Sequence, residues 1–175
     1  MKNFNYYTPT EIVFGNDSES KIGYLVRRYE GTKVLIHYGG KSAERSGLLN
    51  DICRQLDAEG ILYVKLGGVV PNPRLSKVYE GIELCRKEGV NHILAIGGGS
   101  VIDSAKAIAY GLAYDGDVWD LFDGKAEAKA CYPIGVVLTI PAAGSEMSNG
   151  CVITNEVGSR KRAYNNDLAR PKFAI

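Results

Sequence analysis

Short apolar runs rich in β-branched residues alternate along the chain with longer stretches in which apolar residues recur every three or four positions. The first pattern is typical of buried strands and the second of helices that cover a sheet. The patterns predict strands over residues 33–38, 61–66, 92–96 and 134–139, and helices over residues 48–56, 75–85 and 101–112. Strands that alternate with helices in this way predict a parallel sheet built from βαβ units.

The two ends of the chain are less regular. Residues 10–14 predict an added strand, and residues 18–28 predict a helix. Two short polar strands at residues 152–155 and 162–165 predict a hairpin. The last residues, 172–175, form a strand-like apolar run with no helix or polar tail after it to close the layer, so we expect the chain to be the first domain of a longer protein.

The composition fits one globular domain and excludes several classes of function. The 175 residues are 45% hydrophobic and 23% charged, with 21 basic and 20 acidic side chains. Because the charges balance and form no runs, we expect no nucleic-acid partner. The apolar runs are strand-sized and no signal-peptide pattern is present, so we expect a cytoplasmic protein with no membrane partner.

Cysteine and histidine offer little chemistry here. The four cysteines form no C-x-x-C pair and lie far apart in the sequence, so we expect free thiols. Cys53 and Cys85 fall on apolar helix faces, where a small buried hydrophobe is a simpler interpretation than a nucleophile. His37 and His92 are the only histidines, and a catalytic metal needs about three converging protein ligands. We therefore expect both histidines to be structural, with no metal site and no Ser-His-Asp or Cys-His site.

The strongest local signal is the turn Gly97-Gly98-Gly99-Ser100, between a predicted buried strand and a predicted helix. Glycine lets the backbone approach a phosphate closely, and the helix N-terminus offers free N–H groups to an anion. The turn departs from the G-x-G-x-x-G fingerprint, which places glycine where this chain has Ile102. A tight strand-to-helix connection is an equally good interpretation of these residues alone.

Two other turns follow predicted strands. Residues 39–42 read Gly-Gly-Lys-Ser, and no acidic residue precedes Glu44. Sites selective for NAD place an acidic side chain at such a strand end, so this turn either leaves room for a ribose 2'-phosphate or forms a solvated loop. Residues 139–148 are mostly small and follow another strand, where they suit a nucleotide lying across the sheet or form a simple loop.

Several spaced motifs together closely resemble the iron-containing, group III alcohol dehydrogenase family: residues 97–100 with Asp103 and Lys106, residues 71–73, residues 139–148 and residues 153–156. The chain is most similar to the NADP-dependent butanol dehydrogenase branch, which shares the Tyr-Gly-Gly turn and the segment 117–122. The resemblance covers essentially the whole chain in order. The family commonly has threonines at the positions of Ala142 and Ala143, so these two residues offer the cofactor no hydroxyl group.

The resemblance implies a Rossmann-like α/β fold, a parallel sheet with flanking helices like the N-terminal domain of dehydroquinate synthase. It implies that residues 1–175 form an NADP-binding domain. In the family, the pyrophosphate binds at the positions of Gly97, Gly98, Gly99 and Ser100. The rest of the groove corresponds to Asn72, Thr139, Ser145 and Lys161, and the adenosine 2'-phosphate faces Gly40 and Ser42. Asp103 would lie near the nicotinamide, although a carboxylate in the first turn of a helix is also a favourable partner for the helix dipole.

The implied activity of the complete protein is hydride transfer between NADP(H) and a primary alcohol or aldehyde. The family holds a divalent metal, iron or zinc, on one aspartate and three histidines of a following helical domain, which this chain lacks. We therefore expect no catalytic residue in this chain, no activity from it alone, and a homo-oligomer for the complete protein. The alternative is a non-catalytic domain that binds NADP(H) or a partner chain without turnover.

Overall fold

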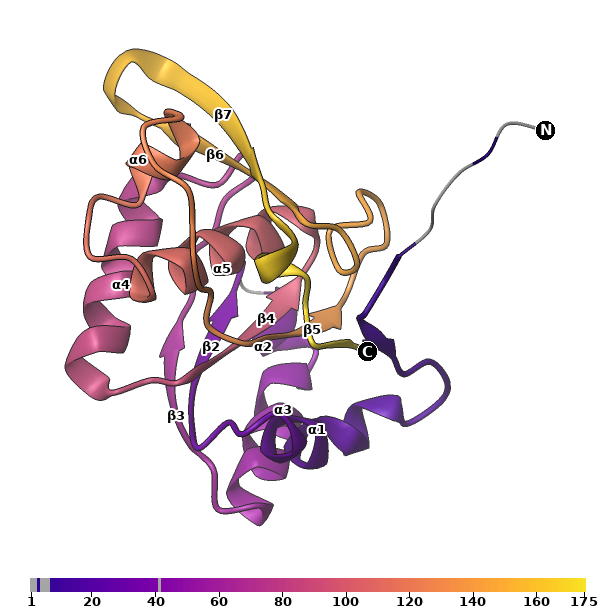
Figure 1. The fold of residues 1–175 in the computed structure, drawn as a ribbon. Helices are drawn as coiled ribbons and strands as arrows, with labels where there is room; N and C mark the ends of the chain where they lie inside the picture. Colours follow the sequence, from indigo (N-terminus) through magenta and orange to yellow (C-terminus); the bar gives the residue numbers. More distant parts are fainter. Residues whose placement is uncertain (1–2, 4–6, 41) are drawn as a thin grey trace.

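A six-stranded parallel sheet forms the centre of the protein. The computed structural model describes residue 3, residues 7–40 and residues 42–175, and for Ser42 it describes the backbone only. The strand order is β1-β8-β5-β4-β2-β3, and every neighbouring pair is parallel (Figure 1). The strands are β1 (Glu11–Ile12), β2 (Lys33–Tyr38), β3 (Leu62–Leu66), β4 (His92–Gly97), β5 (Ile134–Leu138) and β8 (Phe173–Ala174).

Helices cover both faces of this sheet. On one face lie α4 (Leu75–Glu88) and α5 (Gly99–Leu112), and on the other lie α1 (Ile22–Arg28) and α3 (Leu48–Ala58) (Figure 1). Along β4, Ile93 and Ala95 belong to the first core, whereas Leu94 and Ile96 belong to the second. Successive side chains of a strand point to opposite faces. Because both faces are buried, β4 reads as a continuous apolar run rather than an alternating one.

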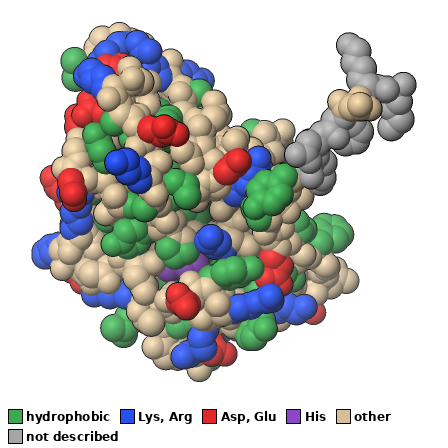
Figure 2. Space-filling view, in the orientation of Figure 1, with side chains coloured by type: hydrophobic (Ala, Val, Ile, Leu, Met, Phe, Trp, Pro, Cys, Tyr) green, Lys and Arg blue, Asp and Glu red, His purple; other side chains and the backbone are tan. Residues whose placement is uncertain are grey.

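A two-stranded antiparallel hairpin lies outside the main sheet. It consists of β6 (Gly150–Asn155) and β7 (Arg160–Asn165); β6 packs on α5 and α4, and β7 contacts the short helix α6 (Trp119–Phe122) (Figure 1). Lys and Arg side chains gather over this part of the molecule, while both signs of charge are mixed over the rest of the same face (Figure 2). The remaining short elements are α2 (Ser42–Arg45), η1 (Ser18–Lys21), η2 (Val157–Ser159) and η3 (Asp167–Ala169).

The structure confirms the predicted α/β class and corrects one detail: the helix predicted over residues 18–28 is divided into η1 and α1. The strand-like run at residues 172–175 contains β8, a strand with partners on both sides, β1 and β5. Within the described residues, no helix is both long and apolar enough to cross a membrane.

Candidate functional site

The chain reverses its direction of travel across the sheet between β2 and β4. From β2 it moves outward to β3, and from β4 it moves outward on the opposite side to β5. The connections that follow β2 and β4 therefore diverge at the carboxyl edge of the sheet. In open α/β sheets, ligands bind in the crevice at such a point. Residues 39–42 and 97–100, both singled out from the sequence, flank it.

The turn after β4 leads directly into the N-terminus of α5. A side chain at Gly97 has no room, because a Cβ there would lie 2.6 Å from Cγ2 of Val101. A Cβ at Gly98 would meet nothing closer than the carbonyl oxygen of Ile140, at 3.6 Å. Gly98 is the N-cap residue of α5, and no side chain caps this helix. The turn thus combines open space with backbone N–H groups at the positive end of a 14-residue helix, which suits an anion.

Five predicted site residues line one cavity of about 360 Å³ beside this turn: Asn72, Gly99, Ser100, Asp103 and Lys161. They come from segments far apart in the sequence. Nζ of Lys161 donates a hydrogen bond to Oδ1 of Asn72 at 2.6 Å, which joins β7 to the loop before α4. The structure therefore brings together residues that the resemblance had related only by sequence motif.

Asp103 lies at the border between this cavity and a second one of about 200 Å³, which Ser145 also lines. Oγ of Ser145 donates to Oδ1 of Asp103 at 2.7 Å, and the backbone N–H of Val152 donates to Oδ2 at 3.1 Å. Burial raises the pKa of Asp103, while these two hydrogen bonds act in the opposite direction. With both carboxylate oxygens held, Asp103 has a fixed orientation at the edge of the groove.

Thr139 lies apart from these residues, in a larger and mostly apolar groove of about 620 Å³. Its lining includes Phe14, Leu48, Val137 and Ile175. The motif at residues 139–148 pointed to Thr139 but not to the rest of this groove, because its walls come from four segments that meet only in the folded protein. It lies at the same carboxyl edge of the sheet and has room for a flat apolar ring.

The turn after β2 is only partly described. Gly40 is exposed, and a Cβ there would meet no atom within 4 Å. Lys41 and the side chain of Ser42 lie outside the described residues, so the predicted contact of Ser42 lies there too. The hydroxyl of Tyr38 donates to Oε1 of Glu44 at 3.0 Å, which joins β2 to α2 across the turn.

Both histidines are completely buried. Nδ1 of His37 donates to the carbonyl oxygen of Leu66 at 3.0 Å, and Nε2 accepts from Oγ of Ser104 at 2.9 Å. His92 stacks on the ring of Phe173, and its ring nitrogens have no hydrogen-bond partner among the described residues. Burial lowers the pKa of each histidine to about 4. Across residues 7–40 and 42–175, no group of three or more His, Cys, Asp or Glu side chains could hold a metal ion.

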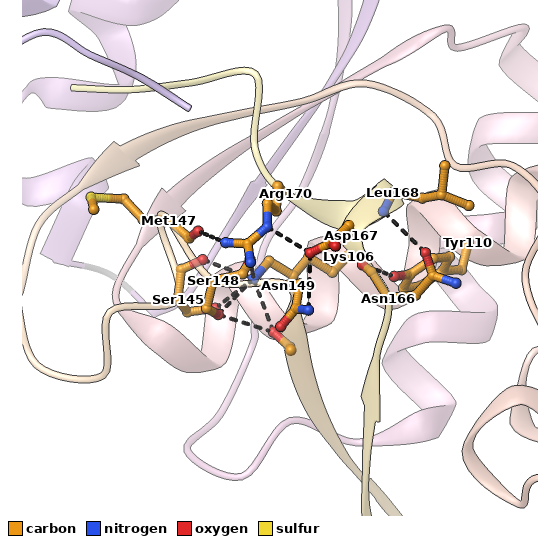
Figure 3. A network of polar contacts seen from close by, with 11 residues as sticks. Lys106, Tyr110, Ser145, Met147, Ser148, Asn149, Asn166, Asp167, Leu168 and Arg170 are labelled. Atoms are coloured by element: carbon orange, nitrogen blue, oxygen red, sulfur yellow. Dashed lines mark hydrogen bonds and ion pairs between the residues drawn. The ribbon is translucent and has the colours of Figure 1, made fainter. Parts of the chain in front are cut away.

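Lys106 belongs to a motif of the resemblance, but no role was predicted for it. Its side chain is completely buried, and Nζ donates to the carbonyl oxygens of Ser145, Ser148 and Gly150 at 2.8, 2.8 and 2.9 Å (Figure 3). A lysine within the apolar stripe of a predicted helix was the available signal. Its partners could not be predicted, because every residue has a backbone carbonyl group and the sequence does not show which of them bind a side chain.

Comparison with known proteins found similar sequences and a similar fold. The family model described as iron-containing alcohol dehydrogenase matches residues 9–175. A Bacillus subtilis protein named probable NADH-dependent butanol dehydrogenase 2 is 45% identical over the whole chain, and the Escherichia coli NADPH-dependent aldehyde reductase YqhD is 37% identical. The crystal structure of NADH-dependent butanol dehydrogenase A from Thermotoga maritima, 44% identical, superposes with a TM-score of 0.97 over 100% of this chain and 44% of that one. The chain also spans 45% of the length of each of these two curated relatives.

Proposed function

Because this chain belongs to the iron-containing alcohol dehydrogenase family, we propose that it is the dinucleotide-binding domain of an enzyme that moves hydride between a nicotinamide cofactor and a primary alcohol or aldehyde. The observation that carries the proposal is the cavity of about 360 Å³, in which five predicted residues meet beside the uncapped N-terminus of α5. The cavity lies beside the turn after β4, where Gly98 leaves space for a phosphate and the helix supplies N–H donors, as binding of a dinucleotide requires.

Each part of the cofactor has a matching region of the chain. The N–H groups of residues 97–100 receive the pyrophosphate, and the ammonium of Lys161 supplies a positive charge beside it. The apolar groove next to Thr139 takes the adenine ring. Ser145 and the fixed carboxylate of Asp103 face the nicotinamide half, where they orient the ring and limit the entry of water.

For the choice of cofactor we propose NADP(H). Gly40 is open to solvent, and the strand end before it carries no acidic residue to accept from a ribose 2'-hydroxyl. The names of the relatives include both NADH-dependent and NADPH-dependent enzymes, so the proposal depends on this turn alone.

Calorimetric titration of the 175-residue chain with NADPH and NADH tests both statements. We expect NADPH to bind more tightly, and Gly40→Asp to shift the preference toward NADH by about one to two orders of magnitude, because a carboxylate beside the 2'-phosphate costs a few kcal/mol. Equal affinities in the unaltered chain would contradict the NADP(H) preference. Binding of neither dinucleotide would contradict the proposed function.

The described residues do not fit the metal of the family, because they contain no group of three or more His, Cys, Asp or Glu side chains that could hold it. We expect the chain alone to retain no stoichiometric iron or zinc after dialysis and to show no aldehyde-dependent oxidation of NADPH. Turnover by this chain with one tightly held metal would show that the reaction takes place within it. For the complete protein we propose a cytoplasmic homo-oligomer that acts on small alcohols or aldehydes. The alternative, a protein that binds NADP(H) without turnover, would lack that activity.

A further inference from the structure

The ammonium group of Lys106 is enclosed by five neutral oxygen atoms. Besides the three carbonyl oxygens, Nζ lies 3.2 Å from Oγ of Ser145 and 3.3 Å from Oγ of Ser148 (Figure 3). Burying a charge is costly unless such partners replace its hydration shell. Neutral oxygen ligands of this kind are those of a binding site for a monovalent cation. Here the cation is the ammonium group of a side chain on helix α5.

The oxygens belong to residues 145–150, the end of the connection from β5 together with the first residue of β6, and we term this segment the β5–β6 loop. The N–H groups of Met147 and Ser148 donate to the carbonyl oxygen of Gly144 at 3.2 and 3.1 Å, so the loop begins as a single helical turn. A turn that does not continue leaves its later carbonyl groups without helical partners. Lys106 binds three carbonyl groups of the loop, and Nη1 of Arg170 donates to that of Met147 at 2.7 Å.

The loop in turn fixes the carboxylate at the groove. Ser145 accepts from Lys106 and donates to Oδ1 of Asp103. Gly150 accepts from Lys106 and begins β6, the strand whose Val152 N–H donates to Oδ2. Lys106 itself lines neither of the two cavities that Asp103 borders. It therefore acts on the groove through residues that it holds.

We propose that Lys106 is a positioning residue whose ammonium serves as a built-in monovalent cation, holding the β5–β6 loop in the shape that presents Ser145 and Asp103 to the dinucleotide. The binding part of this proposal rests on the proposed function, whereas the part that concerns the loop does not.

The charge of Lys106 agrees with this role at neutral pH. Burial lowers its pKa to about 8, so the ammonium form predominates at pH 7. The ionisable groups around it are Asp103, Arg170, Cys131 and Cys151. Burial raises the pKa of both thiols above that of Lys106, so both thiols are neutral at pH 7.

Chemical rescue distinguishes a cation site from simple packing. Lys106→Ala removes the ammonium and leaves space for a small cation, whereas Lys106→Met removes the charge and fills that space. We expect both variants to lose at least about tenfold in NADPH affinity, a loss of about 1.4 kcal/mol. Ammonium or ethylammonium chloride should restore Lys106→Ala, tetramethylammonium chloride at the same ionic strength should not, and Lys106→Met should respond to none of them. The control is Lys65→Ala, which removes an exposed lysine on β3 and should show no ammonium effect.

Thermal unfolding of the same proteins keeps the two proposals separate. Ammonium should raise the unfolding midpoint of Lys106→Ala and leave those of the unaltered chain and Lys106→Met unchanged. If the unaltered chain binds no dinucleotide, the proposed function fails, and the unfolding midpoints alone decide the role of Lys106. Full NADPH affinity in Lys106→Ala, a loss without ammonium rescue, or a failure to fold that ammonium does not correct would each overturn the role of Lys106.

Discussion

Two connections at the same edge of the sheet are held in shape by different forces. The connection after β4, residues 97–100, is fixed by its own backbone: Gly97 lies against Val101, and the chain passes at once into α5. The connection after β5, residues 139–149, is held by cations from elsewhere, Lys106 on α5 and Arg170 after η3. The first shape depends on which residues lack a side chain. The second depends on charged side chains that reach it across the fold.

The largest effect we expect is acid destabilisation of the sheet, where His37 on β2 is hydrogen-bonded to Ser104 on α5 and His92 begins β4. The pKa of each is about 4 in the folded protein and near 6.5 when exposed, so the unfolded chain takes up protons first as the pH falls. The free energy of unfolding should drop by about 3 kcal/mol per histidine between pH 6.5 and 4. Urea unfolding across this range measures the drop.

His92→Leu is the matched control for this acid effect. It removes one buried imidazole and should reduce the acid loss by about 3 kcal/mol relative to the unaltered chain. Lys106 keeps its proton throughout this range, because its pKa of about 8 lies above it. Acid should therefore weaken the packing of the sheet while the hydrogen bonds that Lys106 donates to the loop after β5 remain in place. An acid loss of the same size in His92→Leu would show that the imidazole does not cause it.

Gly98→Val tests whether the first connection binds a phosphate. A Cβ at this position meets no atom closer than 3.6 Å, so the fold should remain, while the branched side chain fills the space that a phosphate needs. We expect NADPH affinity to fall at least about 100-fold, or about 2.7 kcal/mol. Calorimetric titration gives the affinity and circular dichroism checks the fold. Native dichroism with unchanged affinity would remove the turn from the proposed site.

Gly97→Ala tests the backbone explanation one residue earlier. Its Cβ would lie 2.6 Å from Cγ2 of Val101, so the turn must shift, and we expect the free energy of unfolding to fall by about 2 kcal/mol. Chemical denaturation measures this loss. The double variant Gly97→Ala/Val101→Ala also shortens the neighbouring side chain. Its loss in the free energy of unfolding should be smaller than the sum of the losses of the two single variants. Full additivity of the two changes would contradict the explanation.

The same contrast explains how far the sequence alone could lead. Periodicity predicted the strands and helices of the sheet because each pattern is local and buried on one or both faces. The turn after β4 was recognisable because its glycines are consecutive. The five oxygen atoms around the ammonium of Lys106 were not recognisable, since the partner that is nearest in the sequence, Ser145, is 39 residues away. The groove beside Thr139 was predicted only in part for a similar reason: Phe14, Leu48 and Ile175 meet Thr139 there only after folding.

The smallest effect we expect comes from removing one serine hydroxyl group in each of the two connections. Oγ of Ser145 donates to Asp103, whereas the hydroxyl of Ser100 has no hydrogen bond to any side chain or backbone group among the described residues. Ser145→Ala should lower the free energy of unfolding by about 1 kcal/mol and raise the pKa of Asp103 further, because the carboxylate loses a donor. Ser100→Ala should change neither quantity measurably.

Chemical denaturation and a carboxyl-carbon NMR titration of Asp103 measure these two quantities. Ser145→Thr keeps the hydroxyl group and should retain most of both, which separates the hydrogen bond from the packing of the side chain. Since polar side chains hold the loop after β5, removal of the hydrogen bond from Ser145 must change the pKa of Asp103. Equal responses of the Ser145 and Ser100 variants would mean that the two connections are held alike.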